Sequence, residues 1–364
     1  MNAEAGVVRI VSGHNGRAQP VFTVLVKRSY RLAHQQAALR CEQDADFRLT
    51  DAYYDNGEPD WSIVQYESEL APCKAMTDVV VIGRAHAPEG QPVQQMLVGV
   101  ALGEHRKLLQ VTGERQCHYR ADQPPLFSDP LPFTEMPIRY DRAYGGRDLV
   151  SDPQIPFHYP RNDMGRGVVL RNVREAVQDR ALPNVEDPQD LLTPERVVIG
   201  EPQLWHQQPL PQGFGWRQRT WFPRSALIGS HPPFLEPGTI TAEERVGVLP
   251  ADYVSLARQN RLPPYEAHFN NGASLGLLFS DLRGDEEMHL LGLTPSQTLS
   301  FRLPGEMPRI GLDLGQGLKP LGTSLQTISI RPDELAMDLI WQASLSYPGY
   351  AWLPKMTRLH AEVC

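Results

Sequence analysis

Three carboxylates that lie close together are the residues of this chain best placed to carry out a reaction. Glu67, Glu69 and Asp78 fall in the stretch 66–79, YESELAPCKAMTDV. A glycosidase needs two carboxyl groups, one as the acid and one as the nucleophile or base. On a strand, Glu67 and Glu69 would project to the same face. The interpretation that we favour is structural: these carboxylates accept backbone N–H bonds or pair with Arg and Lys side chains nearby.

A thiol nucleophile is a second hypothesis for the same stretch. Cys73 lies next to Lys74, and His86 or His118 would have to serve as the base. A chain with 4 Cys and 11 His offers many such combinations, so the hypothesis has little weight. No spacing of Cys or His residues matches a zinc site either. We therefore expect free thiols, and neither a metal nor a cofactor.

Arginines beside glycines form the next group that could bind a ligand. Arg139 and Arg142 precede a Gly-Gly pair, and Arg161 and Arg166 surround a further glycine. Such side chains suit carboxylate or phosphate recognition. The glycine spacing does not fit a strand-to-helix phosphate motif, which argues against a nucleotide. We favour internal salt bridges that hold a Pro-rich region on the sheets, with a surface that contacts a partner as the alternative.

Aromatic residues offer a second kind of contact surface. Trp205, Trp216 and Trp221 could anchor an interface or fill the space beneath long loops, and we favour the second role for the last two. The stretch 347–354, YPGYAWLP, is apolar enough to need a covering surface, either on this chain or on a partner. Our candidates for contact with a partner are Glu67, Glu69, Lys74, Arg139, Arg142, Arg161, Arg166, Tyr350 and Trp352.

Charge and hydropathy limit the possible partners. The 364 residues carry a formal net charge of -8, which gives no general attraction to nucleic acid or to anionic membranes. The N-terminal residues lack the pattern of a secretory leader, and no stretch approaches the ~18 apolar residues of a membrane span. We expect a cytoplasmic protein that binds neither nucleic acid nor membrane.

The elements that must position these residues are mainly strands. In residues 1–150 the apolar residues alternate or form short β-branched runs, which predicts strands at 21–26, 79–82, 96–102 and 107–111. Turn residues separate the second run from the third, and the third from the fourth. The simplest topology for these strands is a meander of hairpins.

The middle and the end of the chain differ in pattern. Prolines recur throughout 151–274, which predicts a long loop region with short helices near 168–177 and 252–260. Residues 275–364 return to a period of two, with strands at 288–293, 299–303, 309–314, 325–330 and 337–345 and turns at 294–297 and 303–306.

A mainly β fold follows from this pattern. We predict an antiparallel β-sandwich or paired sheets, with a long Pro-rich loop region and a few short helices. The expected organisation is an N-terminal β region at 1–150, a loop-rich middle at 151–274 and a C-terminal β region at 275–364. The first and last regions are expected to share a core.

Several blocks of sequence resemble one family. Beside the stretch 66–79, they are 137–146 (PIRYDRAYGG), 160–167 (PRNDMGRG), 182–188 (LPNVEDP), 212–229 (QGFGWRQRTWFPRSALIG), 284–305 (GDEEMHLLGLTPSQTLSFRLPG) and 324–341 (SLQTISIRPDELAMDLIW). Together they resemble the type VI secretion accessory proteins that are catalogued as a domain of unknown function, a family distinct from the Eag-type and Tap-type chaperones.

The resemblance implies an adaptor or chaperone. Such a protein would hold a toxic effector, often one linked to a PAAR-like spike tip, and help it to reach the VgrG spike. One stretch departs from the family pattern, because 253–274 lacks the Phe-rich sequence FDxRFFNxAPPDQ and keeps only Phe269-Asn270 and small neighbours. If that stretch touches cargo, the cargo differs. The alternatives are a carboxylate-dependent hydrolase and a structural component of the secretion apparatus.

Overall fold

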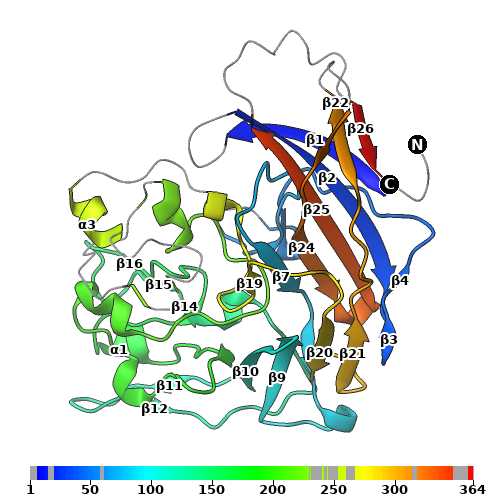
Figure 1. The fold of residues 1–364 in the computed structure, drawn as a ribbon. Helices are drawn as coiled ribbons and strands as arrows, with labels where there is room; N and C mark the ends of the chain where they lie inside the picture. The colour runs from blue at the N-terminus through cyan, green and yellow to red at the C-terminus, as the bar shows by residue number, and fades with distance from the viewer. Residues whose placement is uncertain are drawn as a thin grey trace.

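Two β-sheets that pack face to face form the frame of the molecule (Figure 1). The computed structural model describes residues 6–14, 20–57, 61–228, 230, 240–241, 244, 253–259, 267–313, 318–346 and 360–363. The prediction of a mainly β fold with paired sheets is confirmed.

The larger sheet combines strands from both ends of the chain. β2 pairs antiparallel with β25 along its whole length, from Val21 opposite Ser346 to Arg31 opposite Ala336. All other pairs in this sheet are antiparallel except β24 with β7, which is parallel. The strand order is β1 (Val7–His14), β2 (Pro20–Arg31), β25 (Ala336–Ser346), β24 (Thr323–Arg331), β7 (Thr77–Val81) and β19 (Leu278–Phe279), with β4 (Leu39–Arg40) beside β2.

The second sheet is built around two hairpins. Gly103 and Glu104 join β9 to β10, and the positive φ of Gly103 (56°) suits a two-residue turn. The turn at 294–297 joins β20 to β21, as the sequence predicts. The strand order is β18 (Val185–Glu186), β10 (His105–Thr112), β9 (Gln95–Leu102), β20 (Glu287–Leu291), β21 (Thr298–Arg302) and β3 (Gln36–Ala37).

The main hydrophobic core lies between these two sheets. Val79, Ile328 and Leu339 of the larger sheet belong to the same buried cluster as Val98 and Leu290 of the second. Strands β20 and β21 bury alternate residues, because one of their faces meets the core and the other meets solvent. Regions 1–150 and 275–364 thus contribute strands to both sheets, while the boundaries that we drew between regions stay a prediction.

The middle of the chain has little regular structure but a core of its own. Tyr159, Trp205 and Phe222 are buried together, and Trp205 meets the other two rings edge to face. The described helices are short, as predicted: α1 (Arg174–Val177) and α3 (Tyr253–Arg258). The remaining strands are β5 (Ala52–Tyr53), β6 (Val64–Tyr66), β8 (Arg84–His86), β11 (Cys117–His118), β12 (Leu126–Phe127), β13 (Glu135–Pro137), β14 (Tyr144–Gly145), β15 (Arg147–Asp148), β16 (Phe157–His158), β17 (Arg166–Gly167), β22 (Ile310–Asp313), β23 (Leu318–Leu321) and β26 (His360–Val363).

Two predicted hairpins are wrong. β7 does not pair with β9, because its five residues are all buried and it lies between β24 and β19 in the other sheet. The turn residues at 303–306 do not join β21 to β22 either. Leu303 and Gly305 donate backbone hydrogen bonds to the 284–286 segment instead, and β22 pairs with β23 and β26. Of the four strands predicted in residues 1–150 to form a meander, only β9 and β10 pair as consecutive neighbours, and near the end of the chain β20–β21 and β24–β25 form such pairs.

Candidate functional site

The stretch 66–79 crosses the molecule between two strands. β6 ends at Tyr66, the chain then forms a loop, and β7 begins at Thr77. The hypothesis that a strand places Glu67 and Glu69 on one face does not apply, because both residues lie beyond the end of β6.

Glu67 forms a buried ion pair with Arg224, the first residue of the 3-10 helix η6 (Arg224–Ile228). Both carboxylate oxygens accept a hydrogen bond from the guanidinium group, and the Nη2–Oε2 distance is 2.9 Å. Arg219 contacts Glu67 Oε2 at 3.4 Å. Burial acts to raise the pKa of Glu67, but the charges of Arg224, Arg219 and Lys74 outweigh it, so the pKa lies below its usual value.

Glu69 forms an ion pair with Lys27. Lys27 Nζ donates to Oε1 at 2.9 Å and to Oε2 at 2.7 Å, and the backbone N–H of Arg48 donates to Oε2 at 2.9 Å. Lys27 lies on β2, and its ammonium is also 3.8 Å from Asp338 Oδ2 on β25. Glu67 and Glu69 therefore bind cations on separate elements and do not converge on a common space.

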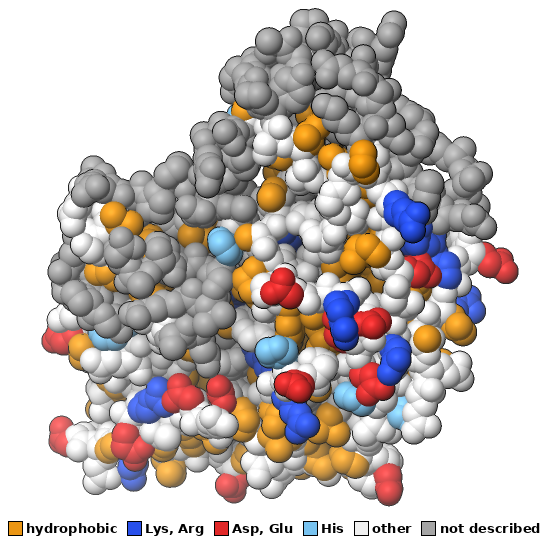
Figure 2. All heavy atoms as spheres, viewed as in Figure 1, with side chains coloured by type: hydrophobic (Ala, Val, Ile, Leu, Met, Phe, Trp, Pro, Cys, Tyr) orange, Lys and Arg blue, Asp and Glu red, His pale blue; other side chains and the backbone are white. Residues whose placement is uncertain are grey.

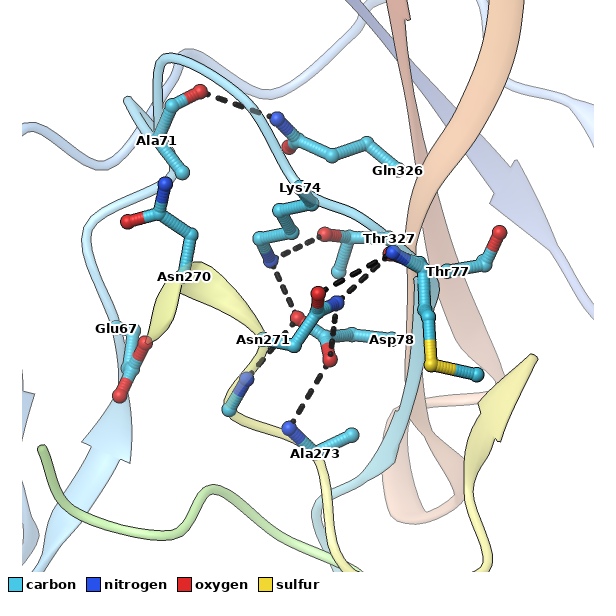
Figure 3. Close-up of polar contacts among 12 residues, drawn as sticks. Glu67, Ala71, Lys74, Thr77, Asp78, Asn270, Asn271, Ala273, Gln326 and Thr327 are labelled. Atoms are coloured by element: carbon cyan, nitrogen blue, oxygen red, sulfur yellow. Dashed lines mark hydrogen bonds and ion pairs between the residues drawn. The ribbon is translucent and has the colours of Figure 1, made fainter. Parts of the chain in front are cut away.

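Lys74 and Asp78 form a third buried pair (Figure 3). Lys74 Nζ lies 2.6 Å from Asp78 Oδ2 and donates to Thr327 Oγ1 at 2.9 Å. The other donors to the Asp78 carboxylate come from 271–273, where the backbone N–H of Ala273 donates to Oδ1 at 3.1 Å. Lys74 also lies over the Trp216 ring, with 4.9 Å from Nζ to the centroid.

Asn271 fastens the loop to the segment that follows the 3-10 helix η7 (Ala267–Asn270). Its Oδ1 accepts the N–H groups of Ala75 and Met76, both at 3.2 Å, and its Nδ2 donates to the carbonyl oxygen of Met76 at 2.7 Å. Asn270 Nδ2 donates to the carbonyl oxygen of Cys73 at 2.5 Å. Figure 3 shows both amides directed at the loop. The end of the stretch 253–274, where Phe269-Asn270 and the small neighbours keep the expected family pattern, thus holds the stretch 66–79 in place.

Cys73 is not arranged as an activated thiol. Burial raises its pKa, which disfavours the thiolate that a nucleophile needs. His86 binds elsewhere, since its Nε2 is 2.8 Å from Asp333 Oδ1. Among the residues described in the structure, no group of three or more His, Cys, Asp and Glu side chains is arranged to hold a metal ion.

The four candidate arginines also make contacts within the chain. Arg142 and Arg166 converge on Glu114, at 2.6 Å and 2.8 Å from its two oxygens, and both contact Asn184 Oδ1. Burial acts to raise the pKa of Glu114, but these two arginines lower it below its usual value. Glu114 lies two residues after the end of β10, so its contacts with Arg142 and Arg166 connect the segments that carry these arginines to that end of the second sheet.

Arg139 and Arg161 differ in burial. Arg139 binds Asp141 at 2.9 Å and Asp55 at 3.1 Å near the surface. Arg161 is almost completely buried and contacts Glu244 through two nitrogens, at 2.6 Å and 2.9 Å. Internal pairing, the role that we favoured for the arginines, is what the structure shows for all four.

The candidate residues therefore separate into four groups. Glu67, Lys74 and Arg161 are buried inside the molecule, so only their neighbours are available to a partner. Arg139, Arg142 and Arg166 keep part of their surface exposed, and their contact with a partner stays a prediction. Glu69 is mostly buried against Lys27. Tyr350 and Trp352 lie outside the described residues.

Sequence reasoning missed the partners that complete these pairs. Arg224, Asn271 and Lys27 are as important to the arrangement as Glu67 and Lys74. One feature of the sequence could have indicated Arg224: it lies in the block 212–229, which carries the family resemblance together with the stretch 66–79. On the face drawn in Figure 2, basic and acidic side chains are interspersed and do not gather by sign.

The comparison with known families agrees with the extent of the resemblance. A family model described as "uncharacterized protein conserved in bacteria (DUF2169)" matches residues 17–342. The chain belongs to this family. Neither a curated protein nor a solved structure matches it. The match covers the second sheet, the middle region and most of the larger sheet, with β1 outside it, so the buried ion pairs described above all lie within the family's extent. Among the described residues, no helix has the length and apolar character to cross a membrane.

Proposed function

We propose that this protein is a type VI secretion adaptor or chaperone that binds a toxic effector or a PAAR-like protein in the cytoplasm and helps to load it on the VgrG spike. The family resemblance of the seven sequence blocks supports the proposal, and the buried ion pairs explain why these blocks are strongly charged without forming a reaction centre. The molecule would act as a fixed scaffold that presents its surface to another polypeptide.

The single observation that carries a binding role over a catalytic one is the pair formed by Glu67 and Arg224. A general acid needs a carboxyl group whose pKa is raised toward the working pH. Glu67 has the opposite shift, and both of its oxygens bind Arg224. Glu69 is likewise held by Lys27 through both oxygens. Both carboxylates are thus engaged in ion pairs within the chain, which supports a structural role for them over a catalytic one.

Affinity purification from cells with an active type VI locus tests the proposal. The tagged chain is expected to recover one effector or PAAR-like protein at near-equal amounts, together with VgrG. In a strain without VgrG the effector should still be recovered, because an adaptor holds its cargo before loading. Recovery of neither effector nor spike protein, even after chemical crosslinking, would contradict the proposal.

Two further measurements separate the proposal from its alternatives. A structural component of the apparatus would appear in the secreted fraction at the stoichiometry of the spike, whereas an adaptor is expected to stay in the cell. A carboxylate-dependent hydrolase would lose effector delivery in a Glu69→Gln variant that remains folded. Normal delivery by that variant supports the adaptor.

A further inference from the structure

Among the residues that the structure describes, part of the outer edge of β10 in the second sheet has no strand beside it. β10 runs from His105 to Thr112, and on the side away from β9 the one described strand that pairs with it is β18, through Gln110 and Val111. The two-residue strand β18 ends where Pro188 follows Asp187. Proline has no N–H to donate to a ladder, so the pairing with β18 stops there, and within the described ranges no other strand pairs with the rest of this β10 edge.

The hydrogen bonds at the end of β10 show which of its backbone N–H and C=O groups point away from β9. Thr112 N donates to Asn184 O on the β18 side, whereas Gly113 N donates to Gln94 O on the β9 side. Backbone groups alternate between the two edges of a strand. The N–H and C=O groups of Arg106 and Leu108 therefore point to the open edge, and in the described part of the chain no residue bonds to them.

A pocket of about 380 Å³ lies directly beside this edge. Residues 106–108 form one wall, 187–189 close the end next to β18, and 275–276 with Leu278 form part of the opposite wall. Lys107 Nζ donates to the carbonyl oxygen of Leu275 at 2.5 Å, which braces the two walls. The space therefore continues the line of β18 along three residues of β10.

The side chains at the edge define what fits. Arg106 and Leu108 lie two positions apart, so they share one face of the sheet, and both are exposed. Within the described residues the Arg106 guanidinium has no ion-pair or hydrogen-bond partner. Asp187 lies at the opposite end of the pocket, next to the pairing of Glu186 with Gln110. A ligand thus meets positive charge at one end and an apolar side chain beside it.

We propose that the edge of β10 from Arg106 to Leu108 accepts an extended segment of a partner protein as an added strand. Strand addition uses the main-chain groups of an open edge for affinity and alternate side chains for specificity. The segment runs antiparallel to β10, as β9 and β18 do. An apolar residue lies opposite Leu108, and an acidic residue two positions later lies opposite Arg106.

This inference rests on the proposed function in one respect, the origin of the added segment. The bound effector or PAAR-like protein would supply that segment. The β10 edge itself is defined by contacts that do not depend on that origin. Its test can therefore be made without any component of the secretion system.

Selection from a displayed library of random linear nonapeptides on the purified full chain provides the probe. Enriched peptides are expected to share an apolar residue followed two positions later by Asp or Glu. A synthetic peptide with that pattern should slow hydrogen exchange of the Arg106 and Leu108 amides at least tenfold. The amides of Lys107 and Leu109, which point to β9, should not change. Failure to enrich peptides, or protection confined to another part of the chain, would overturn the proposal.

A charge reversal makes the test specific. Arg106→Glu should lower the affinity for the selected peptide at least tenfold. A second peptide, with Lys in place of the acidic residue, should bind the Arg106→Glu variant with the affinity that the first peptide has for the wild type. Arg302→Glu is the matched control, because Arg302 is exposed at the far side of the same sheet on β21 and should leave affinity unchanged. Equal loss in both variants would show a general charge effect and overturn the proposal.

The two proposals can fail separately. Peptide binding at β10 with no effector in the affinity purification would remove the secretion role and leave the edge site standing. Effector binding that is unaffected by Arg106→Glu and by the competing peptide would remove the edge site alone.

Discussion

Arg224 binds both carboxylate oxygens of Glu67, although 157 positions separate the two residues in the chain. The pair joins the loop after β6 to the 3-10 helix η6, which lies within the middle region. Each charge is almost fully buried, so each depends on the other to remain inside the protein.

Removal of one partner is expected to destabilise the protein strongly. Glu67→Gln leaves the Arg224 guanidinium buried without a counter-charge, which costs about 3–5 kcal/mol of unfolding free energy. Urea unfolding of the purified variant measures the loss. Glu135→Gln is the control, because Glu135 pairs with Arg84 on the surface and its loss should cost no more than about 1 kcal/mol. Equal stabilities for the two variants would contradict a supporting role for the Glu67 pair.

Acid should weaken the fold through the same pair. The folded-state pKa of Glu67 lies below the unfolded value of about 4.5, so its contribution is present above pH 4.5 and is lost as the pH falls through the folded pKa. Burial raises the pKa of Glu186, so that group contributes with the opposite sign. Urea midpoints between pH 3 and pH 7 should fall more steeply for the wild type than for Glu67→Gln. Parallel curves would rule out the linkage.

Asn271 should control the order of the stretch 66–79. In Asn271→Ala the partly buried N–H groups of Ala75 and Met76 lose their acceptor, and each lost hydrogen bond costs about 0.5–1.5 kcal/mol. Hydrogen exchange at these two amides is expected to accelerate before the sheets open. Asn172→Ala serves as the control, because the side chain of Asn172 donates only one long bond, at 3.4 Å, to Gln123. Unchanged exchange at both amides would mean that the loop holds itself.

Trp205 should support the middle region. Trp205→Ala removes the centre of a cluster that includes Tyr159 and Phe222, with an expected loss of about 3–5 kcal/mol. Trp61→Ala is the control, since 73% of the Trp61 surface is exposed. Differential scanning calorimetry measures the loss of stability in each variant relative to the wild type. A Trp205 variant as stable as the Trp61 variant would show that the region does not depend on this core.

The local parts of the fold could be predicted from the sequence. Alternation of apolar residues located β20 and β21, and the Gly103-Glu104 turn located the β9–β10 hairpin. These features are set by neighbours in the chain, because a strand face and a two-residue turn each depend on a few adjacent residues.

Long-range pairings could not be predicted in this way. The buried run of β7 has no polar face, so its pattern does not say whether it pairs with β9 or lies between β24 and β19. The same limit applies to Glu67, because its spacing does not select Arg224 from the 35 Lys and Arg residues of the chain. Prolines indicated loops in the middle region, but not that the loops enclose a core around Trp205.

Co-expression of the chain with a candidate effector or PAAR-like protein from the same bacterium, followed by size-exclusion chromatography with light scattering, tests the proposed adaptor role most directly. The role predicts one peak that contains both proteins at the summed mass and persists at micromolar concentration. It also predicts that the effector is less soluble without the chain. Two separate peaks, with the effector equally soluble alone, would contradict it.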